Sequence, residues 1–239
     1  MRFYQVMLLL SFMIFLVRCQ ESNENNNQVS NNPPTTSSEW EQVWADEFDG
    51  EELDLSKWNI LRWRPGWVNN EQQAYTDRDT NIFLEGGNLV IQGLIEPNYS
   101  GTDYSGHQYT SNYTSGRINT DDKFSWTYGR FDIRAKLPVG RGSWPAIWML
   151  GESISSIGWP DCGEIDIMEH VGYDLGVVHG SVHTEAYNHK INTQRSSAKK
   201  ITNVDTEFHV YSIIWDKDMI SFFIDDVQYF LFENDQQGN

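Results

Sequence analysis

The sequence is poor in cysteine. Only two of its 239 residues are cysteines, Cys19 and Cys162, and only Cys162 lies in the body of the chain. A single cysteine there cannot form an internal disulfide, and no cysteine–histidine spacing suggests a zinc site. Cys162 could be a nucleophile in principle, but it directly precedes an acidic segment. We interpret it as a small packed residue.

Basic residues are also scarce. Lysine and arginine together number 17 against 34 acidic residues, which gives a net charge of −17. A phosphate backbone would be repelled by this charge, so we expect no nucleic-acid partner. A neutral sugar polymer meets no such barrier. The chain also carries 10 Trp, 11 Tyr and 12 Phe; we expect more than half of these rings in the core, and the others suit packing against pyranose faces.

No apolar run is long enough to span a bilayer. The longest, Met7 to Val17, has 11 residues, whereas a spanning helix needs about 20. Its length fits the apolar part of an export signal. Cys19 closes the run as in a bacterial lipoprotein signal, although Arg18 departs from the small residue preferred there. We expect residues 1–19 to be a lipoprotein signal and the protein to be an outer-membrane or cell-surface lipoprotein; the alternative is an ordinary secretory peptide and a secreted or periplasmic protein.

The rest of the chain shows no amphipathic helical stretch of any length and no internal repeat. Residues 20–39 are polar and predict a flexible linker, and residues 40–239 predict one domain. Short alternating runs separated by turn residues predict an all-β sandwich. Asp225-Asp226 predicts a hairpin turn, and residues 50–58 a short helical turn. The runs are 88–95, 113–119, 128–137, 144–150, 163–170, 177–183, 208–216, 219–225 and 227–232.

The most informative run is EIDIMEH, residues 164–170. Alternation predicts a strand in which Glu164 and Asp166 share one face. Glu169 has the wrong parity for that face. One extra residue bulged out near Ile167 or Met168 would return it to the same side. We therefore predict a β-bulge that brings three carboxylates together; the alternative is a solvated strand face with scattered acids.

This geometry has a chemical meaning. With the bulge, the Cα atoms of Glu164 and Glu169 lie about 13 Å apart, and side chains leaning together bring the carboxyl groups to about 5 Å. Glycoside hydrolysis with retention uses a separation of about 5–5.5 Å, and inversion about 6.5–9.5 Å. Like charges this close cannot all ionise near neutral pH, so we expect one carboxyl group to stay protonated.

The run resembles the motif E-x-D-x-x-E of glycoside hydrolase family 16, in its laminarinase-like branch. The resemblance extends from Trp40 to about Phe232 through several ordered motifs, which together are more specific than any one of them. They are WADEFDG (44–50), NNEQQAYT (69–76), GGNLVIQ (86–92), YTSGRINT (113–120), YGRFDIRAKLP (128–138), SWPAIWMLG (143–151), HGSVHTEAYNH (179–189) and FHVYSIIW (208–215).

The resemblance implies a concanavalin-like β-jelly roll with a concave cleft. It also implies that Glu164 is the nucleophile, Glu169 the general acid/base and Asp166 an assisting carboxylate. Relatives continue for roughly 40 residues past the position of Phe232, so we expect this domain to lack its last strand or strands. Because a missing central strand exposes unpaired backbone, we predict a poorly soluble, weakly active chain.

Further cleft residues follow from residue chemistry and from the resemblance. The resemblance places Trp144 and Arg117 at the site; for Trp148 a core position is equally expected. Amide and carboxylate groups at Asn69, Asn70 and Glu71 suit sugar hydroxyls, with a simple turn as the alternative. We expect His183 to contact Glu169 or substrate. The spacing of His179 and His183 is weak evidence for a metal.

No cofactor is expected for catalysis. Some relatives bind a structural calcium, for which Glu47 and the Gly87 carbonyl are candidate ligands here. The sequence thus predicts a monomeric, endo-acting, retaining hydrolase of β-1,3 or mixed β-1,3/1,4 glucan. The alternatives are a non-hydrolytic glucan-binding protein or a transglycosylase on the same fold.

Overall fold

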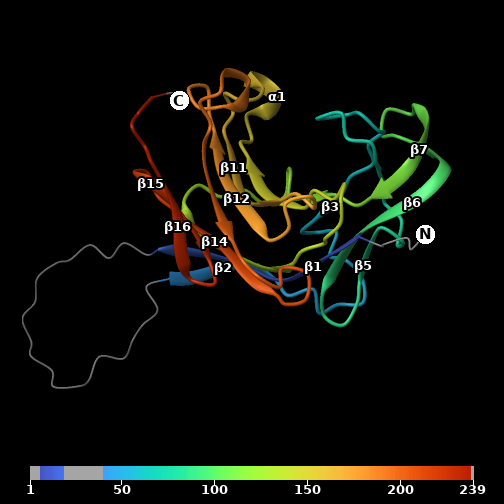
Figure 1. Cartoon of the computed structure of the whole chain (residues 1–239), viewed down its shortest axis with the longest axis horizontal. Coiled ribbons are helices and arrows are strands. Elements are labelled where there is room, and N and C mark those ends of the chain that lie inside the picture. Colours follow the sequence, from blue (N-terminus) through green and yellow to red (C-terminus); the bar gives the residue numbers. More distant parts are fainter. Residues whose placement is uncertain (1–5, 19–39, 238–239) are drawn as a thin grey trace, which may run out of the picture.

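The computed structural model describes residues 6–18 and 40–237. Across these residues two main β-sheets face one another (Figure 1), as predicted for an all-β sandwich. The strands are β1 (Val6–Arg18), β2 (Trp40–Asp46), β3 (Asn59–Ile60), β4 (Ala74–Tyr75), β5 (Ile82–Leu84), β6 (Leu89–Thr102), β7 (Gln108–Ser115), β8 (Ile118–Asn119), β9 (Gly129–Lys136), β10 (Ala146–Leu150), β11 (Glu164–His170), β12 (Val177–His183), β13 (Arg195–Lys200), β14 (His209–Trp215), β15 (Met219–Ile224) and β16 (Val227–Glu233).

The larger sheet runs in the order β16-β15-β14-β9-β1-β6-β7-β4 across the described residues, with β2 paired to β1 and β5 to β6. Strand β9 illustrates why these segments are strands. Phe131, Ile133 and Ala135 are buried at alternate positions, and the residues between them are partly exposed. This two-residue period places every apolar side chain of β9 on the face that meets the second sheet.

The second sheet has the order β10-β11-β12-β13 and is antiparallel throughout. Its core face carries Ile165, Ile167 and Met168 of β11, which join the same apolar cluster as Phe131 and Ile133 of β9. The opposite face of β11 carries its acidic side chains. The sandwich therefore fixes β11 through its apolar residues and leaves its carboxylates on the outer side.

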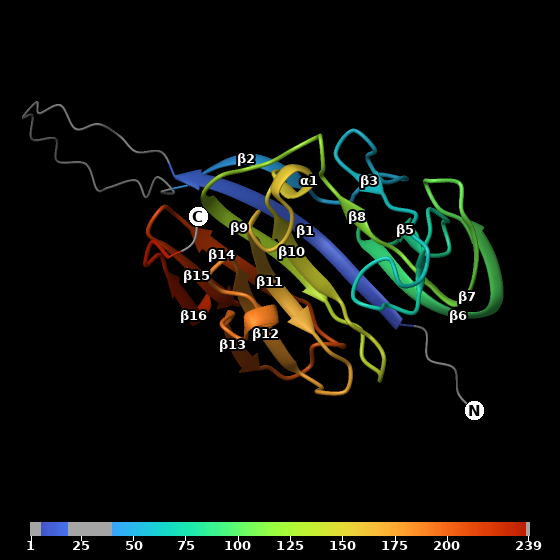
Figure 2. The ribbon, with the colours of Figure 1, turned by 90° about the horizontal axis from the view of Figure 1, so that it is seen from above.

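The long hairpin of β6 and β7 forms a separate wall. It rises beside the four-stranded sheet in Figure 1, and the view from above in Figure 2 places it at the far end of the molecule from β13 and β16. Residues of this hairpin and of the four-stranded sheet line one common cleft.

The predicted runs match the observed strands closely from β9 onward, except that β13 was not predicted; β6 runs on to Thr102, and the run 113–119 covers parts of β7 and β8. The Asp225-Asp226 hairpin is confirmed. Both residues have positive φ, 50° and 60°, as such a turn requires. Residues 50–58 contain only a single turn, in which the Trp58 amide donates to the Asp54 carbonyl. The helical elements of the described residues are α1 (Ile154–Ile157) and the 3₁₀ turn η1 (His189–Ile191), neither of them predicted. No described helix has the length and apolarity to cross a bilayer.

Strand β1 is the main surprise. The segment expected to be an export signal lies between β6 and β9, antiparallel to both. This position does not test the export signal itself, which stays a prediction. Cys19 and the linker 20–39 lie outside the described residues.

Candidate active site

The β-bulge predicted for β11 is present. Against β10, Met168 pairs with Ile147 and Asp166 with Trp148, so Ile167 has no partner of its own. Against β12, Asp166 pairs with Ser181 and Glu169 with His179, so two residues of β11 face Gly180 alone. The extra residue returns Glu169 to the side of Glu164 and Asp166, and all three line the cleft.

The acidic groups lie close together around Asp166. One ligand-type atom from each of Glu164, Asp166 and His183 falls within 4.8 Å of the others. Asp166 is only 4% exposed. Its carboxyl group shares a hydrogen bond with Glu164 and feels the charge of Glu169. Asp166 is therefore the middle member of the three, as the sequence predicted.

Burial and charge repulsion favour a protonated form of the Glu164–Asp166 pair. The pKa of Glu164 is raised, first by burial and then by the charge of Asp166 and the hydrogen bond they share. The pKa of Asp166 is raised as well, first by burial and then by the charge of Glu169. Two carboxyl groups in one hydrogen bond need one proton between them, so the pair retains a proton at pH values where an isolated carboxylic acid has lost it.

Two tryptophans donate hydrogen bonds to the outer glutamates. The Trp144 Nε1–H donates to Glu169 Oε1 at 2.9 Å, and the Trp159 Nε1–H donates to Glu164 Oε2 at 2.6 Å. Each contact occupies one oxygen of a carboxyl group and orients the other. Trp144 thus lies at the site, as predicted.

His183 contacts Asp166, and not Glu169 as expected. Its Nε2 lies 3.2 Å from Asp166 Oδ2, and no contact with Glu169 is seen within the described residues. The reason is register: His183 pairs with Glu164 across the β11–β12 ladder, whereas Glu169 faces His179 at the other end. Burial lowers the pKa of His183, which favours the neutral ring.

Arg117 and Trp148 contact each other. The Arg117 guanidinium lies over three rings, 4.4 Å from Trp63, 4.8 Å from Trp148 and 5.7 Å from Tyr75. The resemblance placed Arg117 at the site, and the structure shows its guanidinium stacked on aromatic faces there. Trp148 lines the cleft and is not core.

The loop 68–73 forms the turn posed as one alternative and also borders the cleft. Asn69 and Asn70 have φ of 51° and 55°, the turn conformation for which asparagine is suited. Both also line the cleft, together with Glu71, whose Oε2 accepts hydrogen bonds from Tyr75 Oη at 2.7 Å and Gln73 Nε2 at 3.0 Å. Neighbouring side chains therefore hold the Glu71 carboxylate in place.

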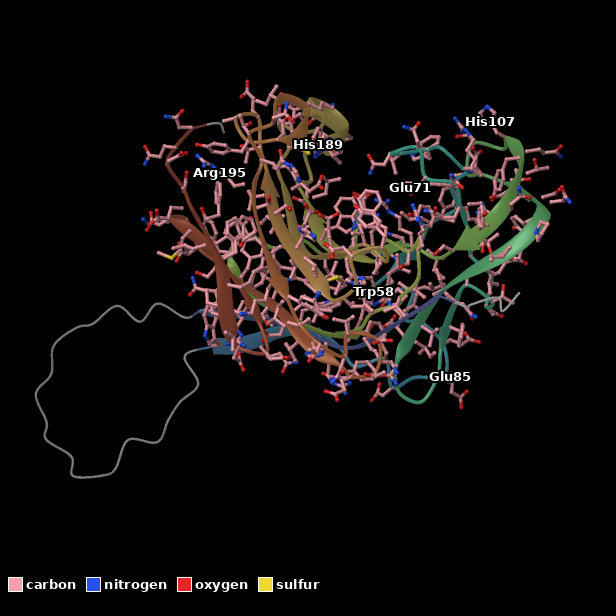
Figure 3. The ribbon with its side chains drawn as sticks, in the orientation of Figure 1. Trp58, Glu71, Glu85, His107, His189 and Arg195 are labelled. Carbon is pink, nitrogen blue, oxygen red and sulfur yellow. The ribbon has the colours of Figure 1, made fainter. Side chains whose placement is uncertain are left out.

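The cleft itself encloses about 1970 Å³. Glu71 on one wall and His189 on the other both line it, and Figure 3 shows these two labelled residues on opposite sides of the central space. Small-ligand pockets occupy roughly 300–1,000 Å³. A space this large suits several sugar units in a row.

Several cleft residues escaped the sequence prediction. Trp159, Trp63 and Tyr75 line the cleft, as do His189 and Lys190 of the loop after β12. Trp159 stands five residues before Glu164, and this closeness was the one available signal. Trp63 and Tyr75 belong to short pairings, a single bridge and a two-residue strand, which leave no periodic pattern to detect.

The calcium candidates border two strands that pair with β1. Along β1, Asp46 at the end of β2 pairs with Met13, and Leu89 at the start of β6 pairs with Leu10. Glu47 directly follows β2, and Gly87 lies in the turn between β5 and β6. Among the described residues, the only grouped set of three acidic, histidine or cysteine ligands is the one around Asp166.

Comparison with known proteins agrees with this geometry. The family model for glycosyl hydrolases family 16 matches residues 65–239. The chain belongs to this family. The family 16 chain is 49% identical over 201 residues to the beta-glucanase of Rhodothermus marinus, covering 82% of this chain and 67% of that protein. It is 36% identical over 207 residues to the glucan endo-1,3-beta-glucosidase A1 of Niallia circulans, covering 81% of this chain.

A solved structure extends the likeness to the fold. The laminarinase from Rhodothermus marinus superposes with a TM-score of 0.72 at 47% identity, covering 81% of this chain and 75% of that one. The jelly roll predicted for this family 16 chain is thereby confirmed. The chain spans only 30% of the length of the Niallia circulans protein.

Proposed function

We propose that the protein is an endo-acting, retaining glycoside hydrolase that cleaves β-1,3 or mixed β-1,3/1,4 glucan. The observation that supports this most directly is the bulge in β11, which gathers Glu164, Asp166 and Glu169 on the floor of one cleft. The volume of the cleft favours attack within a polymer over removal of single end units. The named activities of the relatives point to the same substrate class.

The first chemical step uses both outer glutamates. The free oxygen of Glu164 attacks the anomeric carbon while Glu169 donates its proton to the departing glycosidic oxygen. A glycosyl-enzyme ester and a shortened glucan result. Trp144 occupies Oε1 of Glu169, which leaves Oε2 to face the bond being cleaved.

The second step reverses these roles. Glu169, now ionised, takes a proton from water, and the water oxygen attacks the anomeric carbon and releases Glu164. Asp166 assists by holding the proton of the pair when Glu164 must be anionic. His183 Nε2 lies 3.2 Å from Asp166 Oδ2 and so borders the carboxyl group that holds this proton.

Substrate contacts are proposed for the cleft walls. Trp144 and Trp148 present rings to pyranose faces, and Asn69, Asn70 and Glu71 present hydrogen-bonding groups to sugar hydroxyls. Arg117 stiffens the aromatic wall through its stacking on Trp63 and Trp148.

The test is product stereochemistry. Proton NMR during hydrolysis of a laminarin-type glucan should show the β-anomer first, with inversion to α contradicting the mechanism. Glu164→Gln and Glu169→Gln should each lower kcat by about a thousandfold. Near-normal hydrolysis by either variant would remove that residue from its role.

Added acceptor sugars separate hydrolysis from transfer. A product longer than the substrate would favour the transglycosylase alternative. Binding to insoluble glucan without any new reducing ends would favour a binding protein.

Three further proposals concern the setting of the enzyme. We propose that it is an exported monomer, held at the membrane by a lipid on Cys19. A structural calcium would be held by the Glu47 carboxylate and the Gly87 carbonyl, which border two strands paired with β1. Calcium takes 6–8 oxygen ligands, so these two would be part of a larger set, and the ion takes no part in the chemistry.

A further inference from the structure

Trp159 lies between the nucleophile proposed above and the loop that joins β12 to β13. Its indole N–H donates to Glu164 Oε2. Its ring lies 4.8 Å from the ring of His189 at an interplanar angle of 32°, and 5.7 Å from the ring of His183. The Lys190 Nζ lies 4.6 Å from the same ring. Three side chains therefore fix the orientation of one hydrogen-bond donor.

The loop that supplies His189 and Lys190 is itself braced. Asn188 Nδ2 donates to the carbonyls of Thr184 and Glu185, and Asn188 Oδ1 accepts from the Lys190 amide. This cap begins the 3₁₀ turn His189–Ile191. Asn188 is 3% exposed, so its hydrogen bonds are sheltered from water. These hydrogen bonds hold His189 and Lys190 in place against the Trp159 ring.

We propose that Trp159 is a positioning residue for Glu164, and that His189 and Lys190 hold it there. This inference rests on the proposed function, in which Glu164 is the nucleophile. The indole N–H stabilises the carboxylate form of Glu164 and fixes Oε2, so that Oε1 is the oxygen that attacks. The lysine cation over the ring draws electron density from the indole and strengthens its N–H as a donor.

The electrostatics around Glu164 give the sign of the effect. Burial and Asp166 raise the pKa of Glu164, whereas His183 and the Trp159 hydrogen bond lower it. The charge of Glu169 raises the pKa values of the neighbouring Asp166 and His183. The charge of Glu164 in turn raises the pKa of Cys162, which lies in the loop before β11. Loss of the indole donor removes one of the two lowering influences, so Glu164 should take up its proton at a higher pH.

The decisive measurement is the titration of Glu164 by carbon NMR on protein labelled at the glutamate carboxyl carbon, with Glu164→Gln identifying its signal. Trp159→Phe keeps a ring and removes the donor, and should raise the Glu164 midpoint by at least about half a pH unit. Asp166→Asn removes a repelling charge and should move it the other way. An unmoved midpoint in Trp159→Phe overturns the proposal, whatever the activity.

Lys190→Met tests the contribution of the loop to the position of Trp159, and it gives an answer even if Trp159→Phe does not fold. It keeps the aliphatic stem and removes the cation, and should move the Glu164 midpoint upward by a smaller amount than Trp159→Phe. The matched control is Lys200→Met, on β13 opposite Val177 at the other end of β12, which should leave the midpoint unchanged. Equal shifts in the two lysine variants, or none in Lys190→Met, would overturn the role of the loop.

Kinetics distinguish a positioning role from a structural one. In Trp159→Phe we expect kcat to fall about tenfold at neutral pH with KM within about threefold, and the acid limb of the kcat–pH profile to move upward with the NMR midpoint. A fall in kcat at all pH values with an unmoved limb would indicate general damage and count against the proposal. Loss of hydrolysis in Glu164→Gln, measured alongside, reports on the proposed function independently of either result.

Discussion

Strands β9 and β11 both carry acidic side chains on one face and apolar side chains on the other. They differ in whether the acidic side chains have a basic partner. Strand β9 is regular, and its Asp132 lies 2.9 Å from Arg130 Nε through both carboxylate oxygens. Strand β11 is bulged, and its three acids face one another without a lysine or arginine ion pair among the described residues. A regular strand with a paired acid gains stability from it. The bulged strand gives up stability for a group of carboxylates that can exchange protons.

Shifting the parity of β11 should have the largest effect. Inserting one alanine between Asp166 and Ile167 adds a second extra residue before Glu169, so a strand with a single bulge turns Glu169 toward the core, and hydrolysis should fall by about a thousandfold or more. Ile167→Val is the matched control: it keeps the bulge and should cost about 0.5–1.5 kcal/mol of stability with little loss of kcat. Near-UV circular dichroism reports whether the sheet forms. A folded insertion variant that still cleaves glucan would disprove the role of the bulge.

Neutralising the acid of the regular strand should destabilise the fold at neutral pH. Asp132→Asn leaves Arg130, which is 25% exposed, with Asp226 as its remaining partner, and Asp226 is mostly exposed. We expect a loss of about 1–3 kcal/mol in the free energy of unfolding, with kcat unchanged. Urea denaturation at pH 7 measures it. A gain in stability would show that β9 and β11 do not differ in this respect.

Neutralising the middle acid of the bulged strand should have the opposite sign. The folded-state pKa values of Glu164 and Asp166 are raised, so proton binding stabilises the fold at low pH and this contribution is lost as pH rises from about 4 through the raised values. Asp166→Asn has no carboxyl group to ionise in the folded state, so this loss of stability at higher pH is removed. It should therefore be more stable than the parent by about 1–2 kcal/mol at pH 7, with the difference shrinking by pH 4. Thermal melts at both pH values provide the check, and a variant equally destabilised at both would refute it.

The smallest expected effect concerns calcium. Chelation should lower the Tm by a few degrees, because an ion bound only by the folded state stabilises it. Glu47→Gln should melt at the lower temperature with or without chelator. If chelator does not change the melting temperature of the parent protein, that result contradicts a bound calcium ion.

Much of this molecule follows from periodicity. Strands such as β12, predicted at 177–183 and found at Val177–His183, have strict alternation and clear turn residues at their ends. The bulge was predictable because a single parity conflict, at Glu169, had one simple resolution. The fold class and the gathering of Glu164, Asp166 and Glu169 on one face could therefore be inferred from local pattern.

Contacts between distant segments could not be predicted in this way. Arg117 stacks on Trp63 and Trp148, residues separated from it by long stretches of chain, and nothing in its own neighbourhood indicates this. The partner of His183 depended on the register between β11 and β12. The place of Val6–Arg18 in the sheet was also unforeseen, because its composition equally suits a segment destined for export.

Strand β1 is made first and completed late. Its neighbour β9 ends at Lys136, so on the order of a hundred residues must leave the ribosome before the first segment can find it, and such distant pairings form slowly. Cleavage before a lipidated Cys19 would remove this strand and leave β6 and β9 without the segment that pairs with both. Processing at Cys19 and a β1 that stays in the large sheet therefore exclude each other.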